Sequence, residues 1–134
     1  MESREDLIRY RLARANETLE DARILAELRR WNACVNRLYY ACFYAVSALL
    51  LQRGLSSSKH TGVRSLFNRY YVKTGKVSKA LAQIYNDLFE RRRESDYMDF
   101  INFDEDQVRR WFSQAQIFVE QITRFIDIDK TNRN

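Results

Sequence analysis

The sequence predicts an all-α protein, folded as an up-and-down bundle of four to five helices. Three observations predict this class. The 134 residues include no proline and only three glycines, too few for the frequent turns of sandwiches and barrels. Apolar residues recur at spacings of three and four along several long segments. Hydrophobic residues make up 46% and charged residues 31% of the chain, which favours a packed core over disorder.

A chain of this length corresponds to one domain with a core of its own. We therefore expect a single helical domain over residues 1–134. Its core is expected at about residues 4–128, and residues 129–134 are expected to form a frayed tail.

The first helix is expected over residues 4–29, with Ser3 as its N-cap. One apolar stripe runs along it: Ile8, Leu12, Ala15, Leu19, Ala22 and Ala26. The second helix is expected over residues 32–52 and is apolar on nearly every side, with Gly54 as its stop. Such a helix belongs at the centre of the bundle, or it uses a second face for a partner.

A shorter third helix is expected over residues 59–72, and a break at residues 74–76 follows it. Ser78 can cap a fourth helix that reaches the arginines at 91–93. The side chains expected to point inward from this region are Val77, Leu81, Ile84 and Leu88.

Residues 95–103 have no helical period and are expected to connect the fourth and fifth helices. Asp104, followed three residues later by Gln107, resembles a capping box. The apolar spacing that starts there continues to about residue 128, which predicts a long fifth helix.

The net charge of +5 is distributed unevenly. Residues 52–93 carry +8 and residues 94–129 carry −6, so the sign changes at the Arg93–Glu94 junction. The basic block could form a phosphate-binding face. The two blocks could equally form a self-complementary surface, or be solvated charge without a role.

The cysteines predict a reducing compartment. Cys34 and Cys42 lie eight residues apart in one expected helix, about 12 Å along its axis, which is too far for a disulfide. The charged N-terminus lacks the apolar core of a signal peptide, and no apolar run approaches the roughly 18 residues of a membrane span. We expect a cytoplasmic protein without a membrane segment.

Metal and cofactor chemistry find little support in the sequence. The chain has one histidine, no C-x-x-C motif and no pair of histidines at helical spacing. Its three glycines are too far apart for a phosphate-cradling loop. We therefore expect no metal and no cofactor.

The arginines at 91–93 are the most informative polar segment. Continuing the stripe of the fourth helix brings Arg91 and Arg92 to its two margins, whereas Arg93 points away. A guanidinium that leans toward packed surface needs an anionic partner. That partner could be Asp96 or Asp99, or it could be a phosphate.

Polar residues on two other helices are further candidates. His60 and Lys59 stand at the expected start of the third helix, where backbone N–H groups favour an anion; a lone surface histidine is the alternative. Arg37 and Tyr40 lie on the apolar second helix. They could form hydrogen-bonded packing, a dimer seam or the wall of a polar cleft.

The stretch WNACVNRLYYACFYA at residues 31–45 resembles the second helix of HEPN-domain proteins (higher eukaryotes and prokaryotes nucleotide-binding). The run Lys59–Val63 and the pair Arg92 and Tyr97, with Asp96 before the tyrosine, resemble a small prokaryotic branch of this family. The resemblance implies a helical bundle that dimerises. It also implies a metal-independent ribonuclease, or a toxin paired with a nucleotidyltransferase antitoxin.

The ribonuclease motif of the family is an arginine, four to six residues and a histidine, and two protomers bring the motif together in one cleft. Arg92 matches the arginine, but Tyr97 stands where the histidine would be. A tyrosine, with an ordinary pKa near 10, is a poor base at pH 7. For cleavage, His60 would have to replace the histidine, or Tyr97 would have to be strongly perturbed.

The sequence and the resemblance together predict a dimeric module that binds RNA or nucleotide phosphate, in enzymatic form a metal-independent endoribonuclease toxin. The alternatives are a non-catalytic docking subunit for a nucleotidyltransferase and a purely structural homodimer. Two groups of residues are expected to carry the chemistry. The catalytic candidates are Arg92, Tyr97, Asp96 and His60, and the phosphate- or RNA-binding candidates are Arg91, Lys59, Arg37 and Tyr40.

Overall fold

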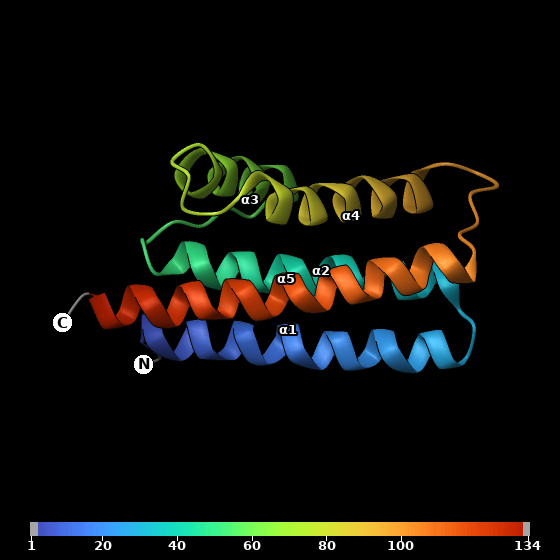
Figure 1. The fold of residues 1–134 in the computed structure, drawn as a ribbon, viewed down its shortest axis with the longest axis horizontal. Helices are drawn as coiled ribbons and strands as arrows, with labels where there is room; N and C mark the ends of the chain where they lie inside the picture. The colour runs from blue at the N-terminus through green and yellow to red at the C-terminus, as the bar shows by residue number, and fades with distance from the viewer. Residues whose placement is uncertain (1–2, 133–134) are drawn as a thin grey trace.

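The computed structural model describes residues 3–132, and it describes the side chains of residues 3–127. Within that range the chain is all-α, as the sequence predicts (Figure 1). Long helices lie side by side along one axis, and a short helix with a π-helical turn lies beside the start of α4. The elements in order are α1 Arg4–Glu27, α2 Trp31–Leu51, α3 His60–Phe67, η1 Asn68–Val72, α4 Lys79–Tyr97 and α5 Glu105–Asn132.

Helix α1 begins where its local signals predict. The Ser3 side chain accepts the backbone N–H of Asp6, and the Asp6 carboxylate accepts the N–H of Ser3. This reciprocal pair satisfies two backbone donors that the first turn leaves free. The predicted apolar stripe faces the core: Ile8, Ala15 and Ala22 are buried, and Leu12, Leu19 and Ala26 pack against them.

Helix α2 is the centre of the bundle, as its apolar surface predicts. It packs against α1, α3, α4 and α5, and twelve of its residues are buried. Among the helices of the described residues, α2 is the one that is long and apolar enough to cross a membrane, although 67% of the relevant window is buried inside this bundle. The expectation that no segment approaches a membrane span overlooked α2, because polar residues interrupt its apolar runs while its average remains apolar.

The third predicted helix is divided in two. Residues 60–67 form α3, and residues 68–72 form the π-helical turn η1. The wider turn brings Tyr71 into the core, where its hydroxyl donates to the carbonyl of Leu49 in α2. This contact with α2 depends on tertiary packing, so the helical period of the sequence does not predict it.

Helix α4 begins after the predicted Ser78 cap, whose side chain accepts the N–H of Leu81. The helix continues to Tyr97, so the prediction that it ends at the arginines 91–93 is wrong. Ion pairs one turn apart support the extension: Arg91 pairs with Glu94, and Arg92 pairs with Asp96.

The buried face of α4 is also displaced from the predicted one. Leu81 and Ile84 are only partly buried, and the buried side chains are Ala82, Tyr85, Leu88, Phe89 and Arg92. Tyr85, Phe89 and Arg92 follow each other at spacings of four and three. Arg92 therefore lies within the inward stripe rather than at its margin, whereas Arg91 is half-buried and Arg93 is exposed as predicted.

The α4–α5 connection is held at one end and projects at the other. Asn32 donates to the carbonyl of Ile101 at 2.8 Å and accepts the N–H of Phe103 at 3.2 Å. Residues 97–100, which we call the tip, project into solvent; Phe100 is 98% exposed and has a φ of +64°. The Asp104–Gln107 capping box then starts α5 as predicted.

Helix α5 extends to Asn132, beyond the predicted end near residue 128. Residues 133 and 134 lie outside the described part, and fraying of the tail stays a prediction. Cys34 and Cys42 are buried and free.

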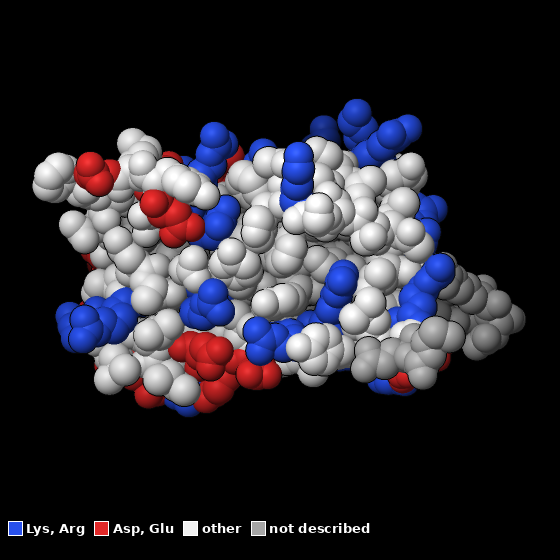
Figure 2. All heavy atoms as spheres, turned by 180° about the vertical axis from the view of Figure 1, so that it is seen from behind, with Lys and Arg blue, Asp and Glu red and all other residues white. Residues whose placement is uncertain are grey.

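The uneven charge of the sequence is visible on the surface. Seen from behind, basic side chains gather at the end formed by α3, η1 and the start of α4, and acidic ones lie beside the α4–α5 connection (Figure 2). At the junction the opposite charges pair within the chain, through Arg91–Glu94 and Arg92–Asp96.

Candidate functional site

A pocket of about 300 Å³ opens between the start of α3 and the end of α4. Three of the four predicted catalytic candidates line it, and the fourth, Asp96, lies beside it because it pairs with Arg92. The residues that line it are His60, Thr61, Phe89, Arg92, Arg93 and Tyr97.

Arg92 is the buried cation of this pocket, with an exposed fraction of 8%. Its guanidinium lies over the ring of Tyr39 at 4.8 Å and near that of Tyr40 at 5.8 Å. Nη1 donates to the carboxylate of Asp96 at 3.2 Å, while Nε has no hydrogen-bond partner among the described residues. Of the three anions that the sequence leaves open, Asp96 is thus the partner within the chain, and one donor of Arg92 remains unused.

His60 is the first residue of α3, as expected, and its ring packs against aromatic residues of α2. Its Nδ1 lies 2.8 Å from the hydroxyl oxygen of Tyr39, and its ring centroid lies 4.6 Å from that of Phe43. Burial, and secondarily the positive charge of Arg92, lower the pKa of His60 below its ordinary value. The imidazole is therefore neutral at pH 7.

The aromatic surroundings of His60 form what we call the His60 cluster: Tyr39, Tyr40, Phe43, His60, Phe89 and Arg92. Tyr40, a predicted contact residue, belongs to it, and Arg37 lies over the Tyr40 ring at 4.9 Å. Three helices, α2, α3 and α4, are joined here by packing.

Other predicted residues lie at or beyond the edge of the pocket. Tyr97 stands at the rim with 78% of its surface exposed, so packing does not hold its hydroxyl toward Arg92. Lys59 is exposed at the N-cap of α3. Arg91 does not line the pocket and donates to Glu94 at 2.8 Å.

Sequence reasoning missed three residues of the cluster: Tyr39, Phe43 and Phe89. Tyr39 is fully buried, and its place in the apolar stripe of α2 suggested only packing. Phe89 was overlooked because the predicted inward face of α4 followed the aliphatic residues. Arg64 also escaped notice: its guanidinium lies 3.8 Å from the Phe89 ring and donates to Glu90.

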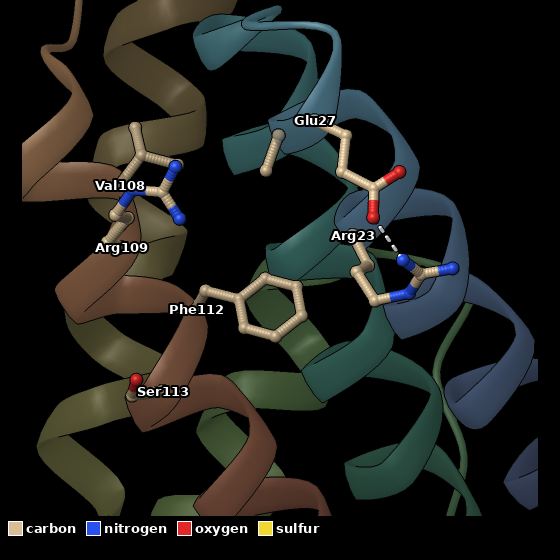
Figure 3. A pocket seen from close by; sticks show the side chains of 7 residues that line it. Arg23, Glu27, Val108, Arg109, Phe112 and Ser113 are labelled. Atoms are coloured by element: carbon tan, nitrogen blue, oxygen red, sulfur yellow. Dashed lines mark hydrogen bonds and ion pairs between the residues drawn. The ribbon is translucent and has the colours of Figure 1, made fainter.

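A second pocket, of about 400 Å³, lies between α1 and α5, with Phe112 on its floor (Figure 3). Its charged residues are all paired within the chain: Arg23 with Glu20 and Glu27, and Arg109 with Glu105. These pairs leave no buried cation in need of a ligand. The pocket at His60 is therefore the stronger candidate.

Metal ligation has no cluster to support it: within the described part of the chain, no three His, Cys, Asp or Glu side chains converge. The nitrogen donors that line the pocket are the guanidinium groups of Arg92 and Arg93 and the imidazole of His60. They suit an anion rather than a cation.

Comparison with known proteins gives consistent matches over most of the chain. A family model described as the HEPN domain matches residues 8–125. A "UPF0332 protein" of Thermotoga maritima is 47% identical over 95% of this chain and 96% of its own length. Two proteins of Methanocaldococcus jannaschii that bear the name "Putative toxin" are 32% identical (82% of this chain, 81% of theirs) and 26% identical (86% and 78%).

Proposed function

The chain belongs to the HEPN-domain family, and from this premise we propose that it is a toxin-like module that binds the phosphate of RNA or of a nucleotide at the His60 pocket. The observation that carries the proposal is the state of Arg92. It is a buried guanidinium whose carboxylate partner is about one-third exposed and whose Nε donor is unused. Burying a charge without full pairing is costly, and a phosphate in the pocket would offset that cost.

The surroundings of Arg92 suit an anionic polymer. No Asp or Glu occurs from residue 52 to residue 86, although seven Lys or Arg residues do. The pocket lies next to this basic block, at the start of α3, whose backbone N–H groups also favour anions. Basic surface of this kind supplies the sequence-independent part of nucleic-acid affinity.

RNA cleavage is the enzymatic form of this proposal, and in it His60 acts in place of the motif histidine. A second candidate, the non-catalytic docking subunit, is favoured by the exposure of Tyr97, which leaves the motif position without a buried proton-transfer group. An assay of RNA cleavage without added metal separates the two. Activity that His60→Asn abolishes supports the enzyme, and binding without cleavage by the unaltered protein supports the docking subunit.

The proposal includes a homodimer and a nucleotidyltransferase antitoxin, both implied by the family resemblance. Support comes from the tip, where Tyr97, Met98 and Phe100 are exposed apolar groups and Phe100 has an unfavourable backbone conformation. Sedimentation of the protein and of its Phe100→Ser variant tests the contact. A monomer at all concentrations would contradict the dimer. A dimer without any RNA affinity would favour the purely structural homodimer.

The decisive experiment measures RNA affinity by fluorescence anisotropy with a labelled single-stranded RNA of mixed sequence. Arg92→Gln is compared with Arg91→Gln, which removes the same charge one residue away and outside the pocket. We expect Arg92→Gln to weaken binding about tenfold and to reduce the salt slope by about 1. Arg91→Gln should weaken it less than about threefold. Equal losses for the two variants would show general electrostatic binding and would refute the site.

A further inference from the structure

Tyr39 is the buried partner of the one histidine in the chain. Its ring is fixed on several sides: it stacks on Tyr85 with centroids 5.9 Å apart and an interplanar angle of 6°, and it contacts the edge of Phe89. Arg92 lies over the same ring. The Tyr39 hydroxyl, 2.8 Å from Nδ1 of His60, therefore has a defined position.

The direction of this hydrogen bond follows from the protonation of its two partners. Burial raises the pKa of Tyr39 to about 12, so the hydroxyl carries its proton at pH 7. The neighbouring Tyr85 hydroxyl makes no hydrogen bond within the described part of the chain, so Nδ1 of His60 is the group bonded to the Tyr39 hydroxyl there. A buried hydroxyl that donated to nothing would cost about 1–3 kcal/mol. Nδ1 of the neutral imidazole is the acceptor that avoids this cost.

We propose that Tyr39 is a positioning residue that holds His60 in the tautomer with its proton on Nε2. The two ring nitrogens point in largely opposite directions, so a bond from Nδ1 to the core turns Nε2 toward the pocket side. The imidazole then presents an N–H donor beside the guanidinium of Arg92.

The functional meaning of this tautomer rests on the proposed phosphate site. With Nε2–H and Arg92 facing the ligand, the pocket offers donors and no acceptor from these two residues. It fits the unprotonated oxygens of a phosphodiester or a nucleotide phosphate. His60 in this form donates a hydrogen bond to a phosphate oxygen. Its pocket-facing nitrogen carries a proton and therefore has no lone pair with which to remove a proton from a 2′-hydroxyl.

The test uses the fact that the chain contains a single histidine. In ¹⁵N-labelled protein, a two-bond ¹H–¹⁵N correlation spectrum shows one imidazole and reports directly which nitrogen is protonated. At pH 7.5 we expect a protonated Nε2 and a bare, hydrogen-bonded Nδ1. A dominant Nδ1–H form would overturn the proposal without any variant.

Tyr39→Phe keeps the ring and removes only the hydroxyl. We expect the Nδ1 resonance to move to that of an unbonded ring nitrogen and the second tautomer to appear. Tyr40→Phe is the matched control: its ring lies 5.5 Å from that of His60, but no bond joins its hydroxyl to the imidazole. An unchanged spectrum for Tyr39→Phe, or equal changes in both variants, would refute the positioning role.

Titration with inorganic phosphate separates this inference from the proposed function. If both hold, phosphate shifts the Nε2 signal of the wild type, and Arg92→Gln removes that response. If the tautomer is as stated but phosphate moves no imidazole signal, the binding site fails while the role of Tyr39 stands. Tyr39→Phe should weaken RNA binding about threefold to tenfold, whereas Tyr40→Phe should weaken it less.

Discussion

The α4 part of the His60 cluster and the tip lie next to each other along the chain, yet they are built in opposite ways. Phe89 and Arg92 point into the bundle, whereas Tyr97 and Phe100, a few residues further on, are 78% and 98% exposed. Both regions are rich in aromatic residues. In the first, rings from α2 and α4 fix a cation and an imidazole. In the second, the rings have no partner within the described chain. Which residues of a motif form a site therefore depends on whether each one faces the bundle or the solvent, and the spacing of the motif does not decide this.

Aromatic truncation should show this contrast most strongly. Phe89→Ala removes a buried ring that also carries the Arg64 guanidinium, and we expect a loss of about 3–5 kcal/mol in the free energy of unfolding. Phe100→Ala should change it by less than about 0.5 kcal/mol, because its ring is in water. Urea denaturation followed by circular dichroism measures both. A similar loss for the two variants would mean that the tip is buried in solution.

The carboxylates on α4 provide the next test. Asp96→Ala leaves the buried guanidinium of Arg92 without its anion, and we expect a loss of about 1–2 kcal/mol. Glu94→Ala breaks the half-exposed pair with Arg91 and should cost less than about 1 kcal/mol. Both carboxylates are about one-third exposed, so the comparison isolates the burial of their partners. Equal losses would show that Arg92 is no more dependent on its anion than Arg91.

Much of the fold follows from local signals in the sequence. Capping residues such as Ser3, Ser78 and Asp104 predict helix starts, because their side chains accept backbone N–H groups within one turn. Long apolar stripes predict the helical segments that follow. The inward face of α4 was misplaced because its buried residues include Tyr85 and Arg92. A prediction that follows only aliphatic residues leaves out both of these side chains.

The site was predictable only in part, for a related reason. Helical geometry alone directed Arg92 toward packed surface. The bond between Tyr39 and His60 joins residues 21 positions apart on two helices, so no local pattern reveals it. The exposure of Tyr97 likewise depends on where α4 ends. The run of arginines at 91–93 led to a predicted end that lies before the actual one.

The backbone of the tip should give a smaller effect of opposite sign. Phe100 has a φ of +64°, which is unfavourable for a bulky residue and open to glycine. Glycine relieves the backbone strain of the folded state but adds entropy to the unfolded chain. We expect the relief of strain to be the larger of the two, so that Phe100→Gly raises the free energy of unfolding by about 0.5 kcal/mol. Asp99→Gly, at a residue outside the positive-φ region, should lower it by about 0.5–1 kcal/mol. Destabilisation by both would show that Phe100 makes contacts in solution.

The smallest expected effect is the pH dependence that His60 adds to stability. Its pKa in the folded protein lies below the ordinary value near 6.5, so below that pH the unfolded chain binds the proton more readily. Stability should therefore fall as the pH falls through 6.5 and toward the folded pKa. His60→Asn, whose amide oxygen can still accept from Tyr39, should remove this part of the slope between pH 7.5 and 5.5.

Burial sets the sign of this effect, and the charges that face the imidazole act in the same direction. Arg92 and Arg93 line the same pocket and Lys59 precedes His60, so no carboxylate among the pocket-lining residues favours the protonated ring. Tyr97→Phe, at the rim, should leave the slope as it is in the wild type. Bound phosphate should reverse the trend, because an anion beside the ring favours its protonation. A wild type that gains stability on acidification without phosphate would contradict the burial of His60.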